Sequence, residues 1–339
     1  MESRTAAGRP LLLTTTADLD ALRSSWDALA ARSGNVFASW EWARAWWRQF
    51  GAGRELSLRV DAHEPSFILP LCREAAGELR FLGHGDSDHL GPICAAATRP
   101  EAAAALRALA AHAGPLVADD LPGGQDWPRL VEAEPSRRTP TPLLHLAGLD
   151  WEGFLASRSR NFRAQVRARE RRLLRAHDVR VRLTDATRLE ADMSALVALH
   201  DARWAGQAGT FRGPREALQR EFARAALERG WLALRLLECD GHPIAALYAF
   251  RYAGAEWYYQ AGRDPAWDRW SPGFVLLCAA IRDAMDKGLS EYRLLRGGEA
   301  YQSRFADADP GTVTIRLERL DCAREGGAGA IAGSRSTVP

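Results

Sequence analysis

Glu256-Trp-Tyr-Tyr-Gln-Ala-Gly-Arg-Asp-Pro-Ala-Trp-Asp-Arg-Trp-Ser-Pro-Gly-Phe-Val275 is the stretch of sequence that decides the fold of this chain. Its aromatic and apolar start predicts a strand over 256–261. Ser271 is a preferred N-cap residue, Pro272 suits the first helical position, and Gly288 suits the position after the last turn, so a helix is expected over 272–287. The free N–H groups at such a helix start form a ready anion site, although a well-capped helix without any ligand explains the same residues.

Strands and helices of both periodicities surround this stretch and indicate an α+β protein. In the second half we expect strands over 231–238, 244–252 and 292–295, a short helix after Gly298 and a last strand over 312–320. The first half has two helical segments, three short strands and a helix over 102–113, in a similar order. We therefore expect mixed sheets flanked by helices, in two tandem, pseudo-duplicated halves.

The division of the chain follows composition. Residues 119–142 are rich in proline, glycine and charge, which favours a boundary there. We expect a degenerate first half over 11–145, a second half over 146–322 that carries the binding core, and a disordered tail over 323–339, where glycine, alanine and serine dominate.

Overall composition excludes several classes of protein. The chain has 339 residues, 47% of them apolar, and its 12 tryptophans exclude a disordered chain. Lys and Arg total 45 against 43 acidic residues, so the net charge of +2 excludes a histone-like role. Lys287 is the only lysine, and arginine is therefore the ordinary surface cation of this protein.

The cysteines and the hydropathy pattern predict a cytoplasmic protein. Five scattered cysteines indicate free thiols rather than a disulfide framework or a zinc site. No run reaches the roughly 20 apolar residues that a membrane-spanning helix requires. We accordingly expect no metal and no transmembrane segment, and the sequence leaves the oligomeric state open.

Five segments, in this order, resemble one known family. They are Phe37-Ala-Ser-Trp-Glu-Trp42 with Trp46-Trp47, Ser159-Arg-Asn-Phe-Arg163, Leu199-His-Asp-Ala-Arg-Trp204, Tyr258-Tyr-Gln-Ala-Gly262 before Ser271-Pro-Gly273, and Leu294-Leu-Arg-Gly-Gly-Glu-Ala-Tyr-Gln-Ser-Arg-Phe305. Over residues 15–320 the chain resembles the GNAT superfamily of acyltransferases. More specifically it is similar to the BioF2-like or CelD-type acetyltransferases, which are related to the Fem-type peptidyltransferases.

The resemblance implies an acyl-CoA donor and places it on the opening stretch. The pantetheine arm would lie along strand 256–261, and the pyrophosphate would bind at the start of the following helix. The donor-binding residues implied are Tyr259, Gln260, Arg269, Ser271, Gly273 and Phe274. The family pattern places glycines where this chain has Pro272 and Phe274, so the single glycine is displaced by one position.

The loop after the strand at 292–295 carries the candidate catalytic groups. Acyl transfer to an amine needs a base that removes a proton and an acid that protonates the leaving thiolate. Glu299 could be the base and Tyr301 the acid, with Arg296 stabilising negative charge, whereas the alternative is an ordinary loop with solvated charges. Arg203 and Trp204 are the other candidate substrate-binding residues.

Several conspicuous features have a structural explanation that we favour. Residues 158–175 contain eight arginines. We favour a solvated or ion-paired helix face here, then a phosphate, CoA or anionic-glycan surface, and nucleic-acid binding last. His200 follows an apolar helix stripe and suits a core histidine. The loop 84–89 could line a substrate site or, less readily, bind a metal. For the tryptophans at 40, 42, 46 and 47 we favour a role in the hydrophobic core over a role as a sugar-stacking platform.

These observations favour a cytoplasmic, acyl-CoA-dependent N- or O-acyltransferase acting on a small molecule or saccharide. The CelD-type resemblance implies a place in exopolysaccharide or cellulose metabolism. Two alternatives remain: a Fem-type transferase that takes its acyl group from aminoacyl-tRNA through the arginine helix, and a non-catalytic binding or scaffold protein of a polysaccharide operon. No P-loop, nucleophile elbow or zinc-ligand spacing supports other classes.

Overall fold

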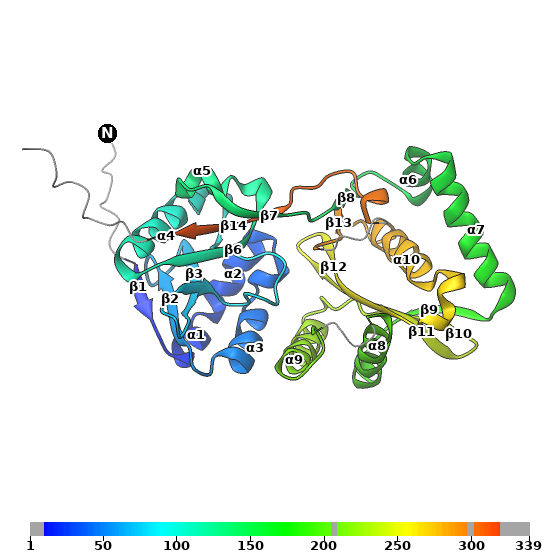
Figure 1. Cartoon of the computed structure of the whole chain (residues 1–339), viewed down its shortest axis with the longest axis horizontal. Coiled ribbons are helices and arrows are strands. Elements are labelled where there is room, and N and C mark those ends of the chain that lie inside the picture. Colours follow the sequence, from blue (N-terminus) through cyan, green and yellow to red (C-terminus); the bar gives the residue numbers. More distant parts are fainter. Residues whose placement is uncertain (1–9, 205–208, 297–301, 319–339) are drawn as a thin grey trace, which may run out of the picture.

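The computed structural model describes residues 10–204, 209–296 and 302–318 of the chain. Two mixed sheets lie side by side, each flanked by helices, with the first half of the chain in blue to cyan and the second half in green to orange (Figure 1). The expected α+β class with two halves is therefore confirmed.

The first half is built on an eight-stranded sheet in the order β1-β2-β3-β4-β6-β14-β7, with β5 paired to β3. Its own strands are β1 (Leu11–Leu13), β2 (Glu55–Val60), β3 (Phe67–Arg73), β4 (Leu79–Phe81), β5 (Ile93–Cys94), β6 (Leu116–Pro122) and β7 (Pro135–Thr139). Its helices are α1 (Thr16–Ala21), α2 (Arg23–Ser33), α3 (Trp40–Phe50), α4 (Arg99–Ala113) and α5 (Trp127–Val131), with 3₁₀ turns at Val36–Ala38, Ala96–Thr98 and Gly123–Gln125. Only β4 and β6 pair in parallel, through the crossover helix α4.

The second half has a six-stranded sheet in the order β8-β13-β12-β11-β10-β9. The strands are β8 (Leu143–His145), β9 (Val179–Leu183), β10 (Arg235–Cys239), β11 (His242–Tyr252), β12 (Ala255–Arg263) and β13 (Glu291–Arg293), with β14 (Thr312–Leu317) in the other sheet. The helices are α6 (Trp151–Ser157), α7 (Arg160–Ala176), α8 (Leu189–Arg203), α9 (Pro214–Glu228) and α10 (Pro272–Asp286), with 3₁₀ turns at Pro265–Trp270 and Gln302–Arg304. Here β12 and β13 form the parallel pair, through α10.

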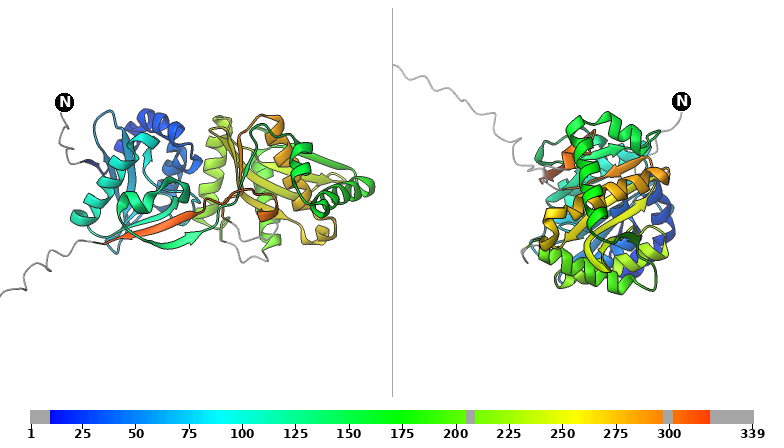
Figure 2. Two further views of the ribbon diagram at one scale, coloured as in Figure 1. Left: turned by 90° about the horizontal axis from the view of Figure 1, so that it is seen from above. Right: turned by 90° about the vertical axis from the view of Figure 1, so that its right-hand side faces the viewer.

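The two halves exchange one strand each. β14 comes last in the chain but lies in the first sheet, between β6 and β7, where it is antiparallel to both. β8 follows β7 in sequence but pairs with β13 of the second sheet. Figure 2 shows β14, in orange to red, running from the second half into the first. The expected division at 145/146 stays a prediction, and a cut there would leave each sheet without a strand that the other half supplies.

The stretch 119–142, where we expect a boundary, has regular secondary structure. It contains the end of β6, helix α5 and strand β7. Asp119 and Asp120 are 6% and 3% exposed within β6, because Arg80 pairs with Asp119 at 2.7 Å and Arg296 pairs with Asp120 at 3.0 Å. Two adjacent aspartates resemble a turn in a sequence, and only the arginine partners make a buried strand possible.

One hydrophobic core is shared by both halves. The helices α2 and α3 of the first half pack with α8, α9 and one face of β11 and β12. Trp42 and Trp46 are 0% and 1% exposed in this core, so the structural interpretation of the tryptophan cluster is confirmed for both. Two further cores lie on the outer faces, beneath α4 and α5 in the first half and beneath α6, α7 and α10 in the second.

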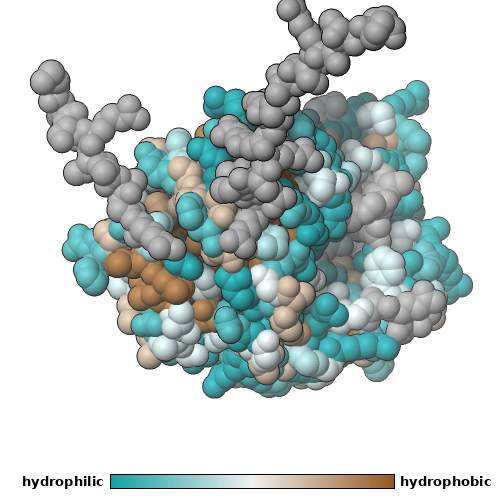
Figure 3. All heavy atoms as spheres, turned by 60° about the vertical axis from the view of Figure 1, so that its left-hand side comes forward, coloured by the Kyte–Doolittle hydropathy of each residue, from teal (hydrophilic) through white to brown (hydrophobic). Residues whose placement is uncertain are grey.

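The described residues include the outer surface of the first half (Figure 3) and four of the five cysteines. No helix within the described ranges is both long and apolar enough to cross a membrane. Figure 3 shows a mainly hydrophilic face of the first half, on which apolar side chains gather in few places. Four cysteines, Cys72, Cys94, Cys239 and Cys278, are buried free thiols.

Candidate active site

The site is organised by the shape of strand β12. Its register with β11 shifts between Tyr248 and Ala249, because Tyr248 pairs with Gln260 whereas Ala249 pairs with Tyr258. Tyr259 is therefore the extra residue of a β-bulge, which bends the strand and redirects side chains. The parallel pairing with β13 ends at Trp257, so the last six residues of β12 extend beyond that partner.

A cavity of about 560 Å³ lies where β12 leaves β13 and α10 begins. It is lined by Arg169, Arg203, Tyr258, Ala261, Gly262, Arg263, Asp268, Ser271, Gly273 and Phe274. We call it the donor cavity. The N–H groups of Gly273 and Phe274 precede the first hydrogen bond of α10, from Val275 N to Ser271 O, so they are open to a ligand. This arrangement suits an anion at the helix start.

Arginine side chains make the donor cavity electropositive. The guanidinium of Arg169 lies 4.4 Å from the ring centre of Phe274, and no carboxylate pairs with it among the described residues. Burial lowers the pKa of Arg169, and the neighbouring Arg304 and Arg172 lower it further. Arg203 donates to the carbonyl of Ala261 at 3.2 Å, at the extended end of β12.

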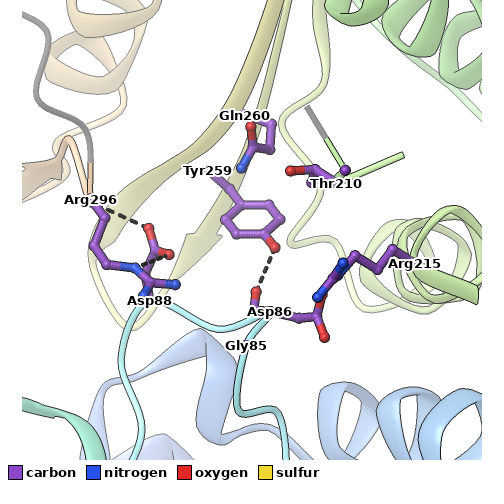
Figure 4. A pocket seen from close by; sticks show the side chains of 9 residues that line it. Gly85, Asp86, Asp88, Thr210, Arg215, Tyr259, Gln260 and Arg296 are labelled. Carbon is purple, nitrogen blue, oxygen red and sulfur yellow. Dashed lines mark hydrogen bonds and ion pairs between the residues drawn. The ribbon is translucent and has the colours of Figure 1, made fainter. Parts of the chain in front are cut away.

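A second cavity, of about 200 Å³, lies between the two halves (Figure 4). It is lined by Gly85, Asp86 and Asp88 of the first half and by Gly209, Thr210, Arg215, Tyr259, Gln260 and Arg296 of the second. We call it the inter-half cavity. Tyr258 and Tyr259 are adjacent in β12 yet line different cavities, so the two cavities flank the strand at its bulge.

One wall of the inter-half cavity is an ion-pair network centred on Arg296. Its Nε contacts Asp88 at 2.8 Å, its Nη1 contacts Asp120 at 3.0 Å, and its Nη2 donates to the carbonyl of Ser87 at 2.7 Å. Burial raises the pKa of both aspartates, and Arg296 opposes that shift. Arg296 thereby connects the two halves. These contacts also hold Arg296 itself in place, directly before residue 297.

The opposite wall holds Asp86 and the bulge residue. The Tyr259 hydroxyl donates to the backbone carbonyl of Asp86 at 2.5 Å and accepts from Gln219 Nε2 at 3.2 Å. Burial raises the pKa of Tyr259, so this hydroxyl stays protonated at neutral pH. The indole N–H of Trp46 donates to Asp86 at 3.2 Å, and that of Trp42 donates to Ser87 at 2.7 Å. The buried tryptophans thus hold the loop 83–89 in place.

His200 lies beneath this region as a buried neutral imidazole. It is 1% exposed, and its Nδ1 has no hydrogen-bond partner within the described part of the chain. Burial lowers its pKa, and a hydrogen bond with Gln260 opposes that shift. The expectation of a core histidine is confirmed by its burial, and its contact with Gln260 places it next to a cavity-lining side chain.

The structure distributes the residues expected in the site over both cavities. Arg203, Ser271, Gly273 and Phe274 line the donor cavity, and Tyr259, Gln260 and Arg296 line the inter-half cavity. Arg269 and Trp204 line neither. The guanidinium of Arg269 lies 5.0 Å from the ring centre of Trp270, and Trp204 is 44% exposed. Glu299 and Tyr301 lie outside the described residues.

One local expectation at the donor cavity is wrong. Ser271 is the residue before α10, but its backbone is left-handed, with φ 56° and ψ 50°, and its side chain caps no N–H group of the helix. A capping serine requires an extended backbone, which the preceding 3₁₀ turn over 265–270 does not leave at this position.

Sequence reasoning did not name six charged residues of the two cavities. Arg169, Arg263 and Asp268 line the donor cavity, and Asp86, Asp88 and Arg215 line the inter-half cavity. The interpretation of loop 84–89 as substrate-lining identified the segment of Asp86 and Asp88. The arginine-rich segment 158–175 includes Arg169, but nothing in the sequence distinguishes Arg169 from its neighbours there. Nothing distinguishes Arg215 from the chain's other arginines either, because both positions depend on how the halves and helices pack.

A separate group of Cys72, Glu74 and His84 has the ligand types of a metal site, with the candidate atoms within 4.8 Å of one another. Glu74, however, pairs with Arg54 at 2.7 Å and with His84 at 3.1 Å. Burial raises the pKa of the Cys72 thiol to about 12, which keeps it protonated. This arrangement favours a hydrogen-bonded cluster, and the guanidinium of Arg54 opposes a cation there.

Comparisons with known proteins agree with this geometry. Residues 160–303, which lie in the second half, match the family model of the acetyltransferase (GNAT) domain. No curated protein matches the chain.

Solved structures show the same fold over nearly the whole chain. The C-terminal domain of a putative lysylphosphatidylglycerol synthetase from Agrobacterium fabrum has a TM-score of 0.63 at 10% identity, covering 88% of this chain and 93% of that one. FemX has a TM-score of 0.61 at 11% identity, covering 87% and 96%. L-PGS from Bacillus licheniformis has a TM-score of 0.59 at 10% identity, covering 91% and 93%. At these identities the likeness concerns the fold.

Proposed function

We propose that this protein is an acyl-CoA-dependent acyltransferase that moves the acyl group directly to an amine or hydroxyl of a small-molecule or saccharide acceptor. The observation that carries the proposal is the pair of cavities on either side of the β12 bulge, one of them electropositive at a helix start. A donor in one cavity and an acceptor in the other would meet at Tyr259 and Gln260.

The residues of the donor cavity fit the parts of coenzyme A. The N–H groups of Gly273 and Phe274, together with Arg169, would hold the pyrophosphate. The pantetheine amides would hydrogen-bond to the part of β12 that extends beyond β13, from Tyr258 to Arg263. The displaced glycine does not obstruct this mode, because Pro272 is at the helix start and the two following N–H groups precede the first helical hydrogen bond.

The chemistry requires a nucleophile and two proton transfers. The acceptor nitrogen or oxygen attacks the thioester carbonyl, a C–N or C–O bond forms, and the C–S bond breaks with its electron pair on sulfur. A base takes the proton of the nucleophile and an acid protonates the thiolate. Glu299 and Tyr301 stay the proposed base and acid. The ion pairs of Arg296 support this, because they fix one end of the segment that carries both residues.

Binding of acyl-CoA is the direct test. We expect acetyl-CoA, malonyl-CoA or a longer acyl-CoA to raise the melting temperature and to bind in calorimetry. Arg169→Ala should raise the Kd about tenfold, because a charge-assisted contact to phosphate is lost. Arg171→Ala is the matched control, since Arg171 is exposed on the same helix and, among the described residues, its side chain bonds only to the backbone of Arg167. Failure of every acyl-CoA to bind would refute the proposal.

Turnover tests the catalytic assignment separately. We expect the Glu299→Gln/Tyr301→Phe double variant to bind the donor with unchanged affinity but to release no thiol. Full turnover by this variant would remove both residues from the mechanism, whichever donor the enzyme uses.

An aminoacyl-tRNA donor is the second candidate, and one observation favours it. Helix α7 lines the donor cavity with Arg169 and carries further exposed arginines along its length: Arg160, Arg167, Arg171, Arg172 and Arg175. Salt-sensitive tRNA binding that Arg171→Ala weakens, together with an absence of acyl-CoA binding, would select this donor.

The saccharide acceptor and a role in exopolysaccharide or cellulose metabolism are supported by the CelD-type resemblance. The N-acetyl specificity is supported by the match to the GNAT domain model. A role as a binding or scaffold protein without catalysis would be indicated if acyl-CoA bound but no acceptor released thiol.

A further inference from the structure

We propose that the inter-half cavity selects an amine that also carries a carboxylate, that is, an amino-acid-like acceptor, and that Arg215 binds the carboxylate. The inference rests on the proposed acyl transfer and names the acceptor class for it. Four charged side chains line this cavity. They differ in whether their polar atoms are already paired within the protein or remain available to a ligand.

The polar atoms of Arg296 and Asp88 already have hydrogen-bond partners within the protein. All three guanidinium nitrogens of Arg296 have protein acceptors, and both carboxylate oxygens of Asp88 accept from Arg296, one from its backbone N–H at 3.0 Å and one from Nε at 2.8 Å. This wall therefore offers a ligand no unused charge and acts as a rigid support.

Arg215 differs, because only part of its guanidinium is used. Nε donates to Asp86 at 2.7 Å, whereas within the described residues neither Nη1 nor Nη2 has an acceptor. The side chain is 46% exposed, while Asp86, which holds it, is 6% exposed. Figure 4 shows Arg215 directed from α9 toward Asp86 at the edge of the cavity. A guanidinium fixed at Nε presents its two terminal nitrogens as a fork.

Two glycines keep the surroundings of this fork clear. A Cβ atom built on Gly85 would lie 3.9 Å from Nη2 of Arg215, and one built on Gly209 would lie 3.6 Å from Nη1. Longer side chains at these positions would cover the fork. Gly85 also has φ +84°, a backbone conformation that favours glycine.

The fork and the size of the cavity define the ligand. Two parallel N–H donors in one plane match a carboxylate, which accepts two hydrogen bonds in the same geometry. A cavity of about 200 Å³ suits a small polar molecule such as an amino acid. The amine of such a molecule would be directed toward Tyr259 and Gln260, on the strand that separates this cavity from the donor.

The test compares amino acids with their decarboxylated amines. Each of the twenty L-amino acids is measured by calorimetry without a donor, and by thiol release with the acyl-CoA that binds best. Histidine and histamine, tyrosine and tyramine, and lysine and cadaverine serve as pairs that differ only in the carboxylate. We expect at least one amino acid to bind and to be acylated, with its decarboxylated amine at least about tenfold weaker.

Two substitutions separate recognition from structure. Arg215→Gln should raise the KM for the amino acid at least about tenfold, with little change in kcat and none in acyl-CoA affinity. Arg215→Lys keeps a cation for Asp86 but has no second arm, so it should restore the melting temperature while the KM stays high. Arg212→Ala, at an exposed neighbour in the same turn, is the control and should behave as the wild type.

The outcomes distinguish this inference from the proposed function. Amino-acid binding that Arg215→Gln abolishes, in a protein that binds no acyl-CoA, would uphold the acceptor site and refute the donor. Acyl-CoA binding with no amino acid bound or acylated, with amines or neutral sugars preferred, or with a KM that Arg215→Lys restores, would overturn the inference.

Discussion

The two halves of the molecule have the same strand connectivity, but the last strand of the antiparallel meander, β4 in the first half and β12 in the second, differs in length. In each half an antiparallel meander leads through a helix to a parallel strand: β2-β3-β4, α4 and β6 in the first, β10-β11-β12, α10 and β13 in the second. β4 has three residues and is followed by the loop with Asp86 and Asp88, whereas β12 has nine and extends beyond its parallel neighbour.

The helix starts differ in charge as well. The first turn of α4 carries Glu101, and the first turn of α10 carries no acidic residue and faces Arg169 and Arg203. An acidic side chain at a helix start competes with a bound phosphate, so only the second half is suited to a phosphorylated donor. In the proposed function, one half binds the donor while the other contributes a loop to the acceptor cavity.

Separating the halves would have the largest effect on this comparison. We expect fragments 11–145 and 146–322, expressed alone, to lack cooperative thermal unfolding, because each loses a strand to the other. When mixed they should form a 1:1 complex that regains the circular dichroism spectrum of the whole chain. Two independent cooperative transitions would show that the exchanged strands are dispensable.

Replacing Arg296 should cause the second-largest loss of stability, because it removes a connection between the halves. Arg296→Met leaves Asp88 and Asp120 buried without this cation and should cost about 3–5 kcal/mol at pH 7. Urea unfolding measures this loss. Arg316→Ala removes an exposed pair with Glu78 and serves as the control, with an expected cost of about 0–1 kcal/mol.

The pH dependence of this variant has a defined sign. The pKa values of Asp88 and Asp120 are raised in the folded protein. These two groups therefore contribute most to the free energy of unfolding below their unfolded-state pKa, and this contribution is lost as the pH rises through their folded-state pKa. Loss of Arg296 raises both values further. The deficit of the variant should therefore be smaller at pH 5 than at pH 8, and a deficit that grows on acidification would contradict this account.

The close contact of α8 with β12 gives an intermediate effect. A Cβ atom on Gly262 would lie 2.3 Å from His200 N and 2.5 Å from Leu199 C, so Gly262→Ala requires a backbone shift and should cost about 1–3 kcal/mol. Gly273→Ala is the matched control, because its nearest neighbour is 3.8 Å away in ordinary contact. Equal stability of the two variants in urea unfolding would show that α8 yields easily.

Two serines at helix starts, one in each half, give the smallest effect. The Ser39 hydroxyl accepts from the backbone N–H of Trp42 at 3.3 Å, so Ser39→Ala should cost about 1 kcal/mol. Ser271 makes no such bond, and Ser271→Ala should be within about 0.5 kcal/mol of the wild type. Chemical denaturation resolves the difference, and equal losses would mean that Ser271 caps α10 in solution.

These two serines also show what could be predicted from the sequence. Local chemistry predicted the start of α10 and the strand before it, because capping residues and side-chain periodicity act over a few neighbours. It did not predict the left-handed backbone of Ser271, which depends on the preceding turn. It did not predict that Asp119 and Asp120 lie buried in a strand, because their arginine partners are distant in the sequence or belong to the other half.

The candidate site follows the same division. The helix start with Gly273 and Phe274 is local, and the sequence identified it. The inter-half cavity depends on the approach of loop 83–89 to β12 and on Arg215. In the sequence, Arg215 is one of more than forty arginines and has no feature that marks it. Long-range packing of this kind leaves no periodic signal in a single sequence.

The late position of β14 in the chain has a consequence for how the protein is made. A ribosome completes residues 10–139 long before it reaches Thr312, yet the first sheet has a place between β6 and β7 that only β14 fills. The facing edges of β6 and β7 therefore stay unpaired until the last strand is released. The half that is synthesised first is the last to be completed, and during that interval its unpaired strand edges are open to pairing with other chains.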